Sequence, residues 1–205
     1  MRTIILALLL LPFIAAAQKT DVFLKLTDAT GQPIKGDVVV KGYERSIGIL
    51  SFSNGGKNNS QLTFNMSVSG SSADLKRAMG SGSLLPAGTL TVTQPGAGAP
   101  TISYTIKMEN IKVSSCSESM GCNGVMNTTT VLIATRIGWT YYQQDATGRS
   151  AVSRKYGFDN ETGREWTNFY HSMAIDKILS GEESGLYKVT AASIIMSSKL
   201  RSISY

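Results

Sequence analysis

The stretch LTFNMSVS, residues 62–69, alternates apolar and polar side chains without a break. Its apolar members, Leu62, Phe64, Met66 and Val68, recur at every second residue. Because successive side chains of a β-strand point to opposite faces, this spacing places all four on one side of an extended chain. The stretch therefore predicts a half-buried strand with one face toward a core.

Similar runs, separated by Gly, Asn, Ser and Pro, extend over most of the chain. Strands are predicted at residues 22–26, 38–43, 47–53, 62–69, 88–94, 101–108, 111–115, 128–143 and 156–159. About eight strands with short connections imply a mainly β, antiparallel sandwich or closed barrel. We favour a compact closed β-barrel, because closure removes strand edges on which other chains could pair.

One short helix is predicted between the strands. Ser71 or Ser72 can cap its first turn, and Gly80 can take the left-handed conformation that ends it. Leu75, Ala78 and Met79 then form a narrow apolar stripe, which we interpret as a packing face.

The first 17 residues are typical of an export signal. Arg2 supplies the positive start, residues 4–14 form an apolar run, and small alanines precede a predicted cleavage at Gln18. A run of about eleven residues is shorter than the ~20 that a membrane helix needs. We predict export to the periplasm or the cell exterior, with no membrane span in the mature chain; the alternative is an uncleaved anchor or a buried strand.

The mature chain divides into residues 18–166, which carry the strand pattern, and residues 167–205. For the second part, an appendage, the sequence predicts no single structure. The net charge of +6 falls to +5 when Arg2 is removed, and the basic residues are scattered. Binding to nucleic acid needs a basic stripe with interleaved aromatic residues, so we predict no nucleic-acid partner.

Cys116 and Cys122 are the only cysteines. An exported protein meets an oxidising compartment, where an even number of cysteines favours a disulfide between them. Zinc and redox sites are disfavoured by the spacing and by the lack of a nearby histidine.

The residues of common catalytic sites are missing from the sequence. It has one histidine, His171, and no Gly-x-Ser-x-Gly motif. The GGK of residues 55–57 imitates part of a phosphate loop, but Asn58 stands where a hydroxyl residue belongs. We predict no enzymatic activity, no cofactor and no metal, and interpret Asp159 and Glu161 as hydrated loop carboxylates.

Three aromatic residues lie near the end of the long predicted strand 128–143. Trp139 and Tyr141 share one face, and Tyr142 takes the other. The trio could form a platform for a carbohydrate or peptide, but the split between faces favours core packing and subunit contact.

Several segments, taken in order, resemble the haemolysin-coregulated protein (Hcp) family, the tube subunits of type VI secretion. They are residues 21–26, 49–53, the helix at Leu75, 90–92, the pair of strands in 104–115, the Gly/Ser-type loop after them and the YGFD of 156–159. Their order and spacing carry the resemblance more than any single piece.

The resemblance implies a β-barrel with one helix that assembles into a hexameric ring. Such rings stack into a hollow tube that can carry secreted effector proteins in its lumen. The family's inter-ring loop corresponds here to Asn54, Gly55, Gly56, Lys57, Asn58, Asn59 and Ser60, the candidate ring-stacking loop. This loop is short, and Asn54 stands where a Trp is usual. Usual tube subunits also carry no signal peptide.

Two other hypotheses remain open. The chain could be a monomeric exported β-barrel that works as a binding module in the periplasm or at the cell surface. It could also be a secreted effector in which residues 167–205 act on a target. The mass of the mature protein in solution separates a ring from the first of these, and removal of the appendage tests the second.

Overall fold

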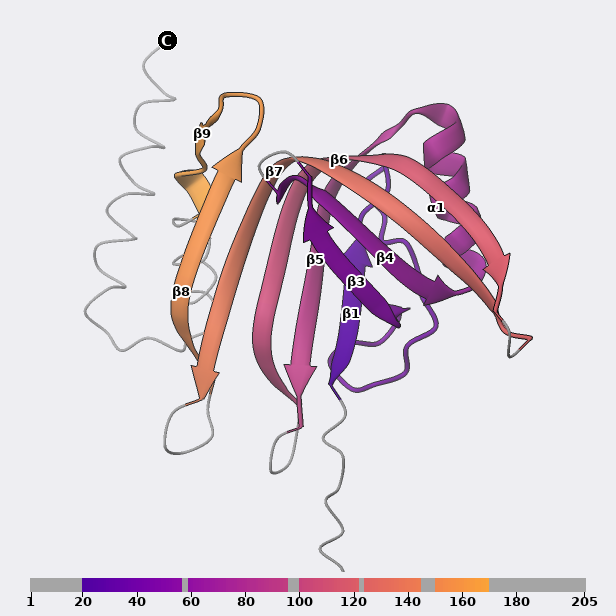
Figure 1. The fold of residues 1–205 in the computed structure, drawn as a ribbon, viewed down its shortest axis with the longest axis horizontal. Helices are drawn as coiled ribbons and strands as arrows, with labels where there is room; N and C mark the ends of the chain where they lie inside the picture. Colours follow the sequence, from indigo (N-terminus) through magenta and orange to yellow (C-terminus); the bar gives the residue numbers. More distant parts are fainter. Residues whose placement is uncertain (1–19, 57–58, 96–99, 122–123, 145–149, 170–205) are drawn as a thin grey trace, which may run out of the picture.

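A computed structural model describes residues 20–56, 59–95, 100–121, 124–144 and 150–169 of the chain. Most of the described residues form the strands of one sheet. A single α-helix accompanies this sheet (Figure 1). The elements are β1 Asp21–Leu26, β2 Ile47–Ile49, β3 Ser51–Gly55, β4 Gln61–Ser67, α1 Gly70–Ser81, β5 Leu84–Gln94, β6 Thr101–Met120, β7 Met126–Gln144, β8 Ser150–Asp159 and β9 Arg164–Glu165. The predicted signal peptide lies outside the described residues.

All the strands pair antiparallel, in the order β2-β1-β5-β6-β7-β4-β3, with β8 also on β7 and β9 on β8. β4 pairs with the first part of β7, and β8 pairs with its second part. The mainly β fold class, with one short helix, is confirmed.

The predicted closure of the barrel is wrong at the level of hydrogen bonds. The two ends of the sheet, β2 and β3, are successive pieces of one chain segment that is interrupted at Leu50. β2 pairs with β1, whereas β3 pairs with β4, and the Leu50 N–H donates to the Asn65 carbonyl of β4 at 2.8 Å. The segment thus crosses from one partner to the other, so the sheet wraps around the core without a ladder that closes it.

The core lies on the inner face of this wrapped sheet. The alternation that predicted a half-buried strand is confirmed for Leu62, Phe64 and Met66, while Val68 lies beyond β4 and is exposed. The buried side chains come from β1, β2 and β4 to β7, and include Leu24, Leu26, Ile47, Ile49, Leu90, Ile106, Met108, Ile111, Val113, Leu132, Ala134 and Ile137.

The predicted strands at 101–108 and 111–115 are one long strand, β6, which pairs with the similarly long β7. Asn110 has a left-handed backbone with φ 51°. On either side of it, Met108 and Ile111 both point into the core, so the inward face changes from even to odd positions. This local change explains why the alternating pattern breaks there although the strand continues.

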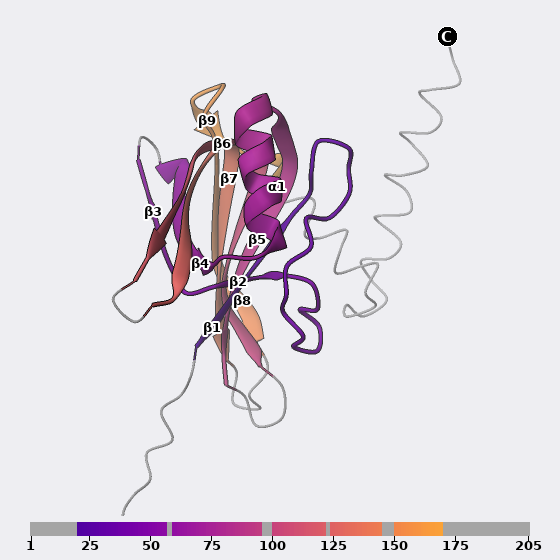
Figure 2. The same cartoon turned by 90° about the vertical axis from the view of Figure 1, so that its right-hand side faces the viewer.

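Helix α1 is longer than predicted and packs against β6 (Figure 2). Ser69 is its N-cap, and Gly82, with φ 66°, is the left-handed residue that ends it, in place of the predicted Ser71 or Ser72 and Gly80. In the predicted apolar stripe of this helix, Leu75 and Ala78 are buried, but Met79 is 37% exposed.

Two other predictions about segments are wrong. Residues 38–43 form a loop, because Gly42 has φ 87° and the chain turns back there; Val39 is 89% exposed. Residues 150–154, for which no strand was predicted, belong to β8, which pairs with the second part of β7.

The described chain ends in a packed turn. Phe169 is buried over two glycines that face each other across the sheet, Gly138 of β7 and Gly157 of β8. Trp166 lies beside Phe169, with ring centroids 5.2 Å apart. The predicted boundary at residue 166 therefore falls inside this turn, and the rest of the predicted appendage lies outside the described residues.

Candidate functional site

The candidate ring-stacking loop connects β3 to β4. Asn54 and Gly55 belong to β3, Ser60 precedes β4, and Lys57 and Asn58 lie outside the described residues. β7 donates a backbone N–H to the Ser60 carbonyl at 3.0 Å. The loop is thus tied to the sheet at both ends, and its first two residues are part of a strand.

The side chain of Asn54 ties this loop to β7. Its Nδ2 donates to the carbonyls of Asn59 at 2.8 Å and Gln61 at 2.9 Å, and its Oδ1 accepts from Trp139 Nε1 at 2.8 Å. Both amide hydrogens and the amide oxygen are therefore used inside the protein. Asn54 positions its neighbours and has no free donor for a ligand.

Four aromatic rings gather beside Asn54. Trp139 stacks on Tyr156 with centroids 5.8 Å apart, and Tyr104 lies against Tyr141 with centroids 5.0 Å apart. Together they line a hollow of about 380 Å³. We call it the aromatic depression, and its lining residues are Asn54, Asn59, Tyr104, Trp139, Tyr141 and Tyr156.

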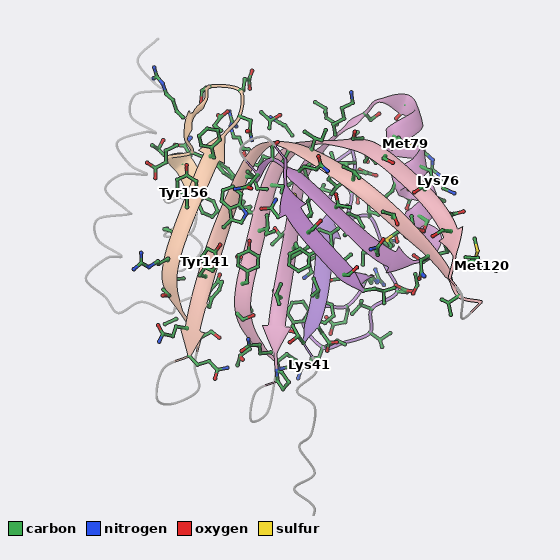
Figure 3. All side chains as sticks on the ribbon, in the orientation of Figure 1. Lys41, Lys76, Met79, Met120, Tyr141 and Tyr156 are labelled. Carbon is green, nitrogen blue, oxygen red and sulfur yellow. The ribbon has the colours of Figure 1, made fainter. Side chains whose placement is uncertain are left out.

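The depression offers aromatic surface to solvent. Trp139 is buried, but Tyr141 is 51% exposed and Tyr156 is 49% exposed, and both lie on the same side of the molecule (Figure 3). Burial, with a smaller effect from the neighbouring Tyr141, raises the pKa of Tyr104. Exposed aromatic faces of this kind can stack on planar or apolar groups.

The structure brings together two features that the sequence indicated separately. Trp139 and Tyr141 lie on one face, as predicted, and meet Asn54 of the stacking loop. Tyr142 is not part of the depression: it lies near Tyr43 on the loop of residues 36–46, and burial raises the pKa of both phenols.

Sequence reasoning missed Tyr104 and Tyr156 as members of this site. Tyr104 belongs to the same alternating run as Ile106 and Met108, so its face was predictable. The pairing of Tyr156 with Trp139 depends on the register between β7 and β8. Because no strand was predicted for residues 150–154, no signal in the sequence indicated that register.

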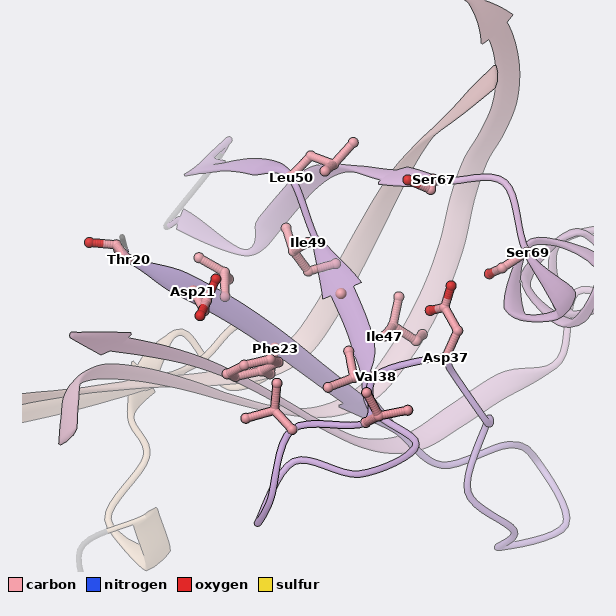
Figure 4. Close-up of a pocket in the computed structure, with 14 residues that line it drawn as sticks. Thr20, Asp21, Phe23, Asp37, Val38, Ile47, Ile49, Leu50, Ser67 and Ser69 are labelled. Atoms are coloured by element: carbon pink, nitrogen blue, oxygen red, sulfur yellow. The ribbon is translucent and has the colours of Figure 1, made fainter. Parts of the chain in front are cut away.

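A second hollow of about 460 Å³ lies between the β1–β2 pair and the loop of residues 36–46 (Figure 4). Val38, Ile47 and Leu50 are among its apolar lining residues, and Asp37 and Ser69 also line it. It is an open apolar groove with a few polar groups at its margins.

Cys116 lies within β6 and is partly buried, and its Sγ accepts a hydrogen bond from Thr130 Oγ1 at 3.6 Å. Cys122 lies outside the described residues, so the disulfide stays a prediction. β6 remains extended as far as Met120, about 13 Å beyond Cys116 at ~3.3 Å per residue. Bonded cysteines have Cα atoms less than about 7 Å apart, so a bridge would require the chain to turn back beyond Met120. A count of thiols in the unreduced protein tests this.

Asp159 is buried, so its interpretation as a hydrated carboxylate is wrong. Its Oδ2 accepts from Arg136 Nε at 2.9 Å, and its Oδ1 accepts from the backbone N–H groups of Glu161 at 2.9 Å and Thr162 at 3.2 Å. Arg136 also lies 3.5 Å from Glu109. The hydrogen bond from Arg136 lowers the pKa of Asp159, which has a structural role at the end of β8.

Within the described part of the chain, no group of three or more His, Cys, Asp or Glu residues could hold a metal ion. Across the same residues, no helix is long and apolar enough to cross a membrane. The single histidine, His171, lies outside the described residues.

Residues 23–141 match the family profile described as "Type VI secretion system effector, Hcp". No curated protein matches the sequence. Among solved structures, Hcp1 from Salmonella typhimurium is similar at 21% identity with a TM-score of 0.59, over 71% of this chain and 98% of that one.

Two further solved structures are similar. One, described as a type six secretion system protein, has 19% identity and a TM-score of 0.62, over 72% of this chain and 99% of that one. The other, the secreted protein Hcp3 from Pseudomonas aeruginosa, has 15% identity and a TM-score of 0.53, over 69% of this chain and 98% of that one. At such identities the structures show a shared fold, whereas the profile matches more than half of the sequence. The chain belongs to the Hcp family of type VI secretion system proteins.

Proposed function

We propose that the protein is a structural subunit that assembles into hexameric rings, and that the rings stack into a tube with a hollow lumen. The observation that carries this proposal is the family match over residues 23–141, which runs from β1 into β7 and so includes the strands around the core. A ring requires surfaces that bind other copies. Exposed large apolar side chains, Met120 and Tyr141 among them, are candidates for such surfaces.

The mass of the mature chain in solution tests the proposal. Light scattering on residues 18–205 should give about six times the monomer mass, because closed rings have a fixed number of subunits. A sample that remains monomeric at high concentration would contradict it. Electron microscopy of the same sample shows whether the rings also stack, and replacing residues 56–59 with a shorter turn should abolish stacking while leaving rings intact.

The proposal includes export and cargo. We propose that residues 1–17 are removed on export to the periplasm or the cell exterior, and that secreted effector proteins occupy the lumen. Mass spectrometry of the protein recovered outside the cytoplasm should show a chain that begins at Gln18. A chain that retains Met1 there would contradict the predicted cleavage.

A second candidate function is that of a monomeric exported binding module. The aromatic depression favours it, because half-exposed rings over a hollow of about 380 Å³ can stack on a sugar or a peptide side chain. Titration with such ligands, followed by tryptophan fluorescence, would show saturable binding by a protein that stays monomeric.

A further inference from the structure

We propose that an exposed apolar tip at the end of the β6–β7 pair, formed by Val68, Met120, Val125 and Met126, docks into the aromatic depression of the next copy. This inference rests on the proposed ring assembly and names the two surfaces that would join in it. Its partner is a second copy of this chain.

The donor surface is an exposed apolar tip formed by Val68, Met120, Val125 and Met126. Met120 ends β6, Met126 begins β7 directly opposite it, and the Val68 N–H donates to the Met126 carbonyl at 3.2 Å. Met120 is the most exposed of the four, at 69%. Large apolar side chains that gather at the end of a projecting hairpin are typical of a contact surface.

The acceptor surface is the aromatic depression. The side-chain amide of Asn54 is fully used by internal hydrogen bonds, and the rest of the lining comes from Asn59 and the rings of Tyr104, Trp139, Tyr141 and Tyr156. Methionine sulfur makes favourable contacts with aromatic rings, and its flexible chain fills irregular hollows. The Met-containing tip is therefore chemically matched to this depression.

The two surfaces lie at opposite ends of the same pair of strands. Tyr104 is near the start of β6 and Met120 is at its end, while Met126 begins β7 and Tyr141 is near its end. Figure 3 shows Met120 on one side of the molecule and Tyr141 on the other. Contact between two different surfaces is head to tail, so it leaves one of each free on every pair and forms a ring where the rotation between copies closes.

A charged side chain also lies beside each surface. Arg154 faces Tyr141 across the β7–β8 pair, and Glu118 lies two residues before Met120 on β6. Glu118 pairs with Lys76 at 2.6 Å, so its attraction for Arg154 adds orientation more than affinity. The apolar contact carries the binding.

Single substitutions test each surface. Met120→Glu places a charge on the tip, and Tyr141→Ala removes an exposed ring from the depression. Each should raise the protein concentration at which half of the chains are in rings by about tenfold or more, because a charge or a gap is buried at every contact. Leu84→Glu is the matched control: Leu84 is also exposed but pairs with Lys112, in the middle of β6 and away from both surfaces. Circular dichroism melting checks that all variants remain folded.

Mixing the two variants gives the decisive result. The Met120→Glu chain keeps its depression and the Tyr141→Ala chain keeps its tip, so the mixture should form one-to-one heterodimers, measured by native mass spectrometry, and no rings. Rings that persist in both single variants would overturn this inference and leave ring assembly standing, with the depression then free for another ligand. A wild-type chain that is itself monomeric would instead end the proposed function, and this inference with it.

Discussion

At the scale of single residues, the ion pair between Arg136 and Asp159 joins the second part of β7 to the end of β8. The Asp159 carboxylate accepts three hydrogen bonds, one of them from the guanidinium. Hydrogen bonds to a charged group in a buried setting stabilise by about 1.5–3 kcal/mol. The end of β8 therefore depends on the ionised form of one side chain.

Asp159→Asn should lower the free energy of unfolding by roughly 1–3 kcal/mol at neutral pH. The pKa of Asp159 is lower in the folded protein than in the unfolded chain, so its contribution is complete above the unfolded pKa of about 4 and is lost as the pH falls through the folded pKa. The difference between the two proteins should therefore shrink in acid, as measured by urea denaturation at several pH values. Glu161→Gln, which alters an exposed side chain, is the control and should change little. A difference that stays constant with pH would contradict the role of the charge.

The glycine pair under Phe169 supplies a second prediction. A Cβ on Gly138 would lie 2.5 Å from the Phe169 ring, so Gly138→Ala should destabilise the protein by about 1–3 kcal/mol through overpacking. Gly80→Ala in α1 meets nothing within 4 Å and should stabilise by roughly 0.5–1 kcal/mol. Thermal melting measures both. In a protein that already carries Phe169→Leu, Gly138→Ala should lower the stability by less. An unchanged loss of stability would show that the added methyl group does not clash with the Phe169 ring.

At the scale of elements, the inner face of β6 changes at Asn110. Its left-handed φ of 51° lets both Met108 and Ile111 point inward, and its carbonyl accepts from Thr135 Oγ1 at 3.2 Å. Asparagine tolerates this conformation better than most residues, and a β-branched residue does not.

Asn110→Val should therefore destabilise the protein by about 1–2 kcal/mol, whereas Asn110→Gly should cost little, since glycine adopts positive φ freely. Urea denaturation of the three proteins gives the comparison. Equal losses for both substitutions would show that the Asn110 side chain matters more than its backbone conformation.

The elements also show how far sequence reasoning reaches. Period-two alternation placed β4 and the buried side of β6 correctly, because one face of each strand meets the core. It failed for residues 38–43, where apolar residues occur in an exposed loop, and for β8, whose polar outer positions resemble a loop. Local composition does not report which strand a segment pairs with. The same limit explains why two of the four rings of the aromatic depression, Tyr104 and Tyr156, were missed.

At the scale of the whole molecule, the segment that contains β2 and β3 takes the place of a closing ladder. It binds β1 first and β4 afterwards, so one stretch of chain holds both ends of the sheet around the core. The long β6–β7 hairpin then extends the sheet in both directions, with the aromatic depression toward one end and the apolar tip at the other. A subunit of this form has its two candidate contacts well separated, as head-to-tail assembly requires.

The balance of forces in that contact leads to a prediction about salt. If Met and Tyr side chains carry the binding, the fraction of chains in rings should hold steady or rise as NaCl increases from about 0.05 to 0.5 M, because screening weakens charge pairs and leaves apolar burial intact. Sedimentation velocity of the mature protein measures this fraction. Arg154→Ala should slow association and leave the salt profile nearly flat, since a rim charge mainly steers the encounter. Rings that dissociate as salt rises would show that ion pairs, not the apolar tip, hold the subunits together.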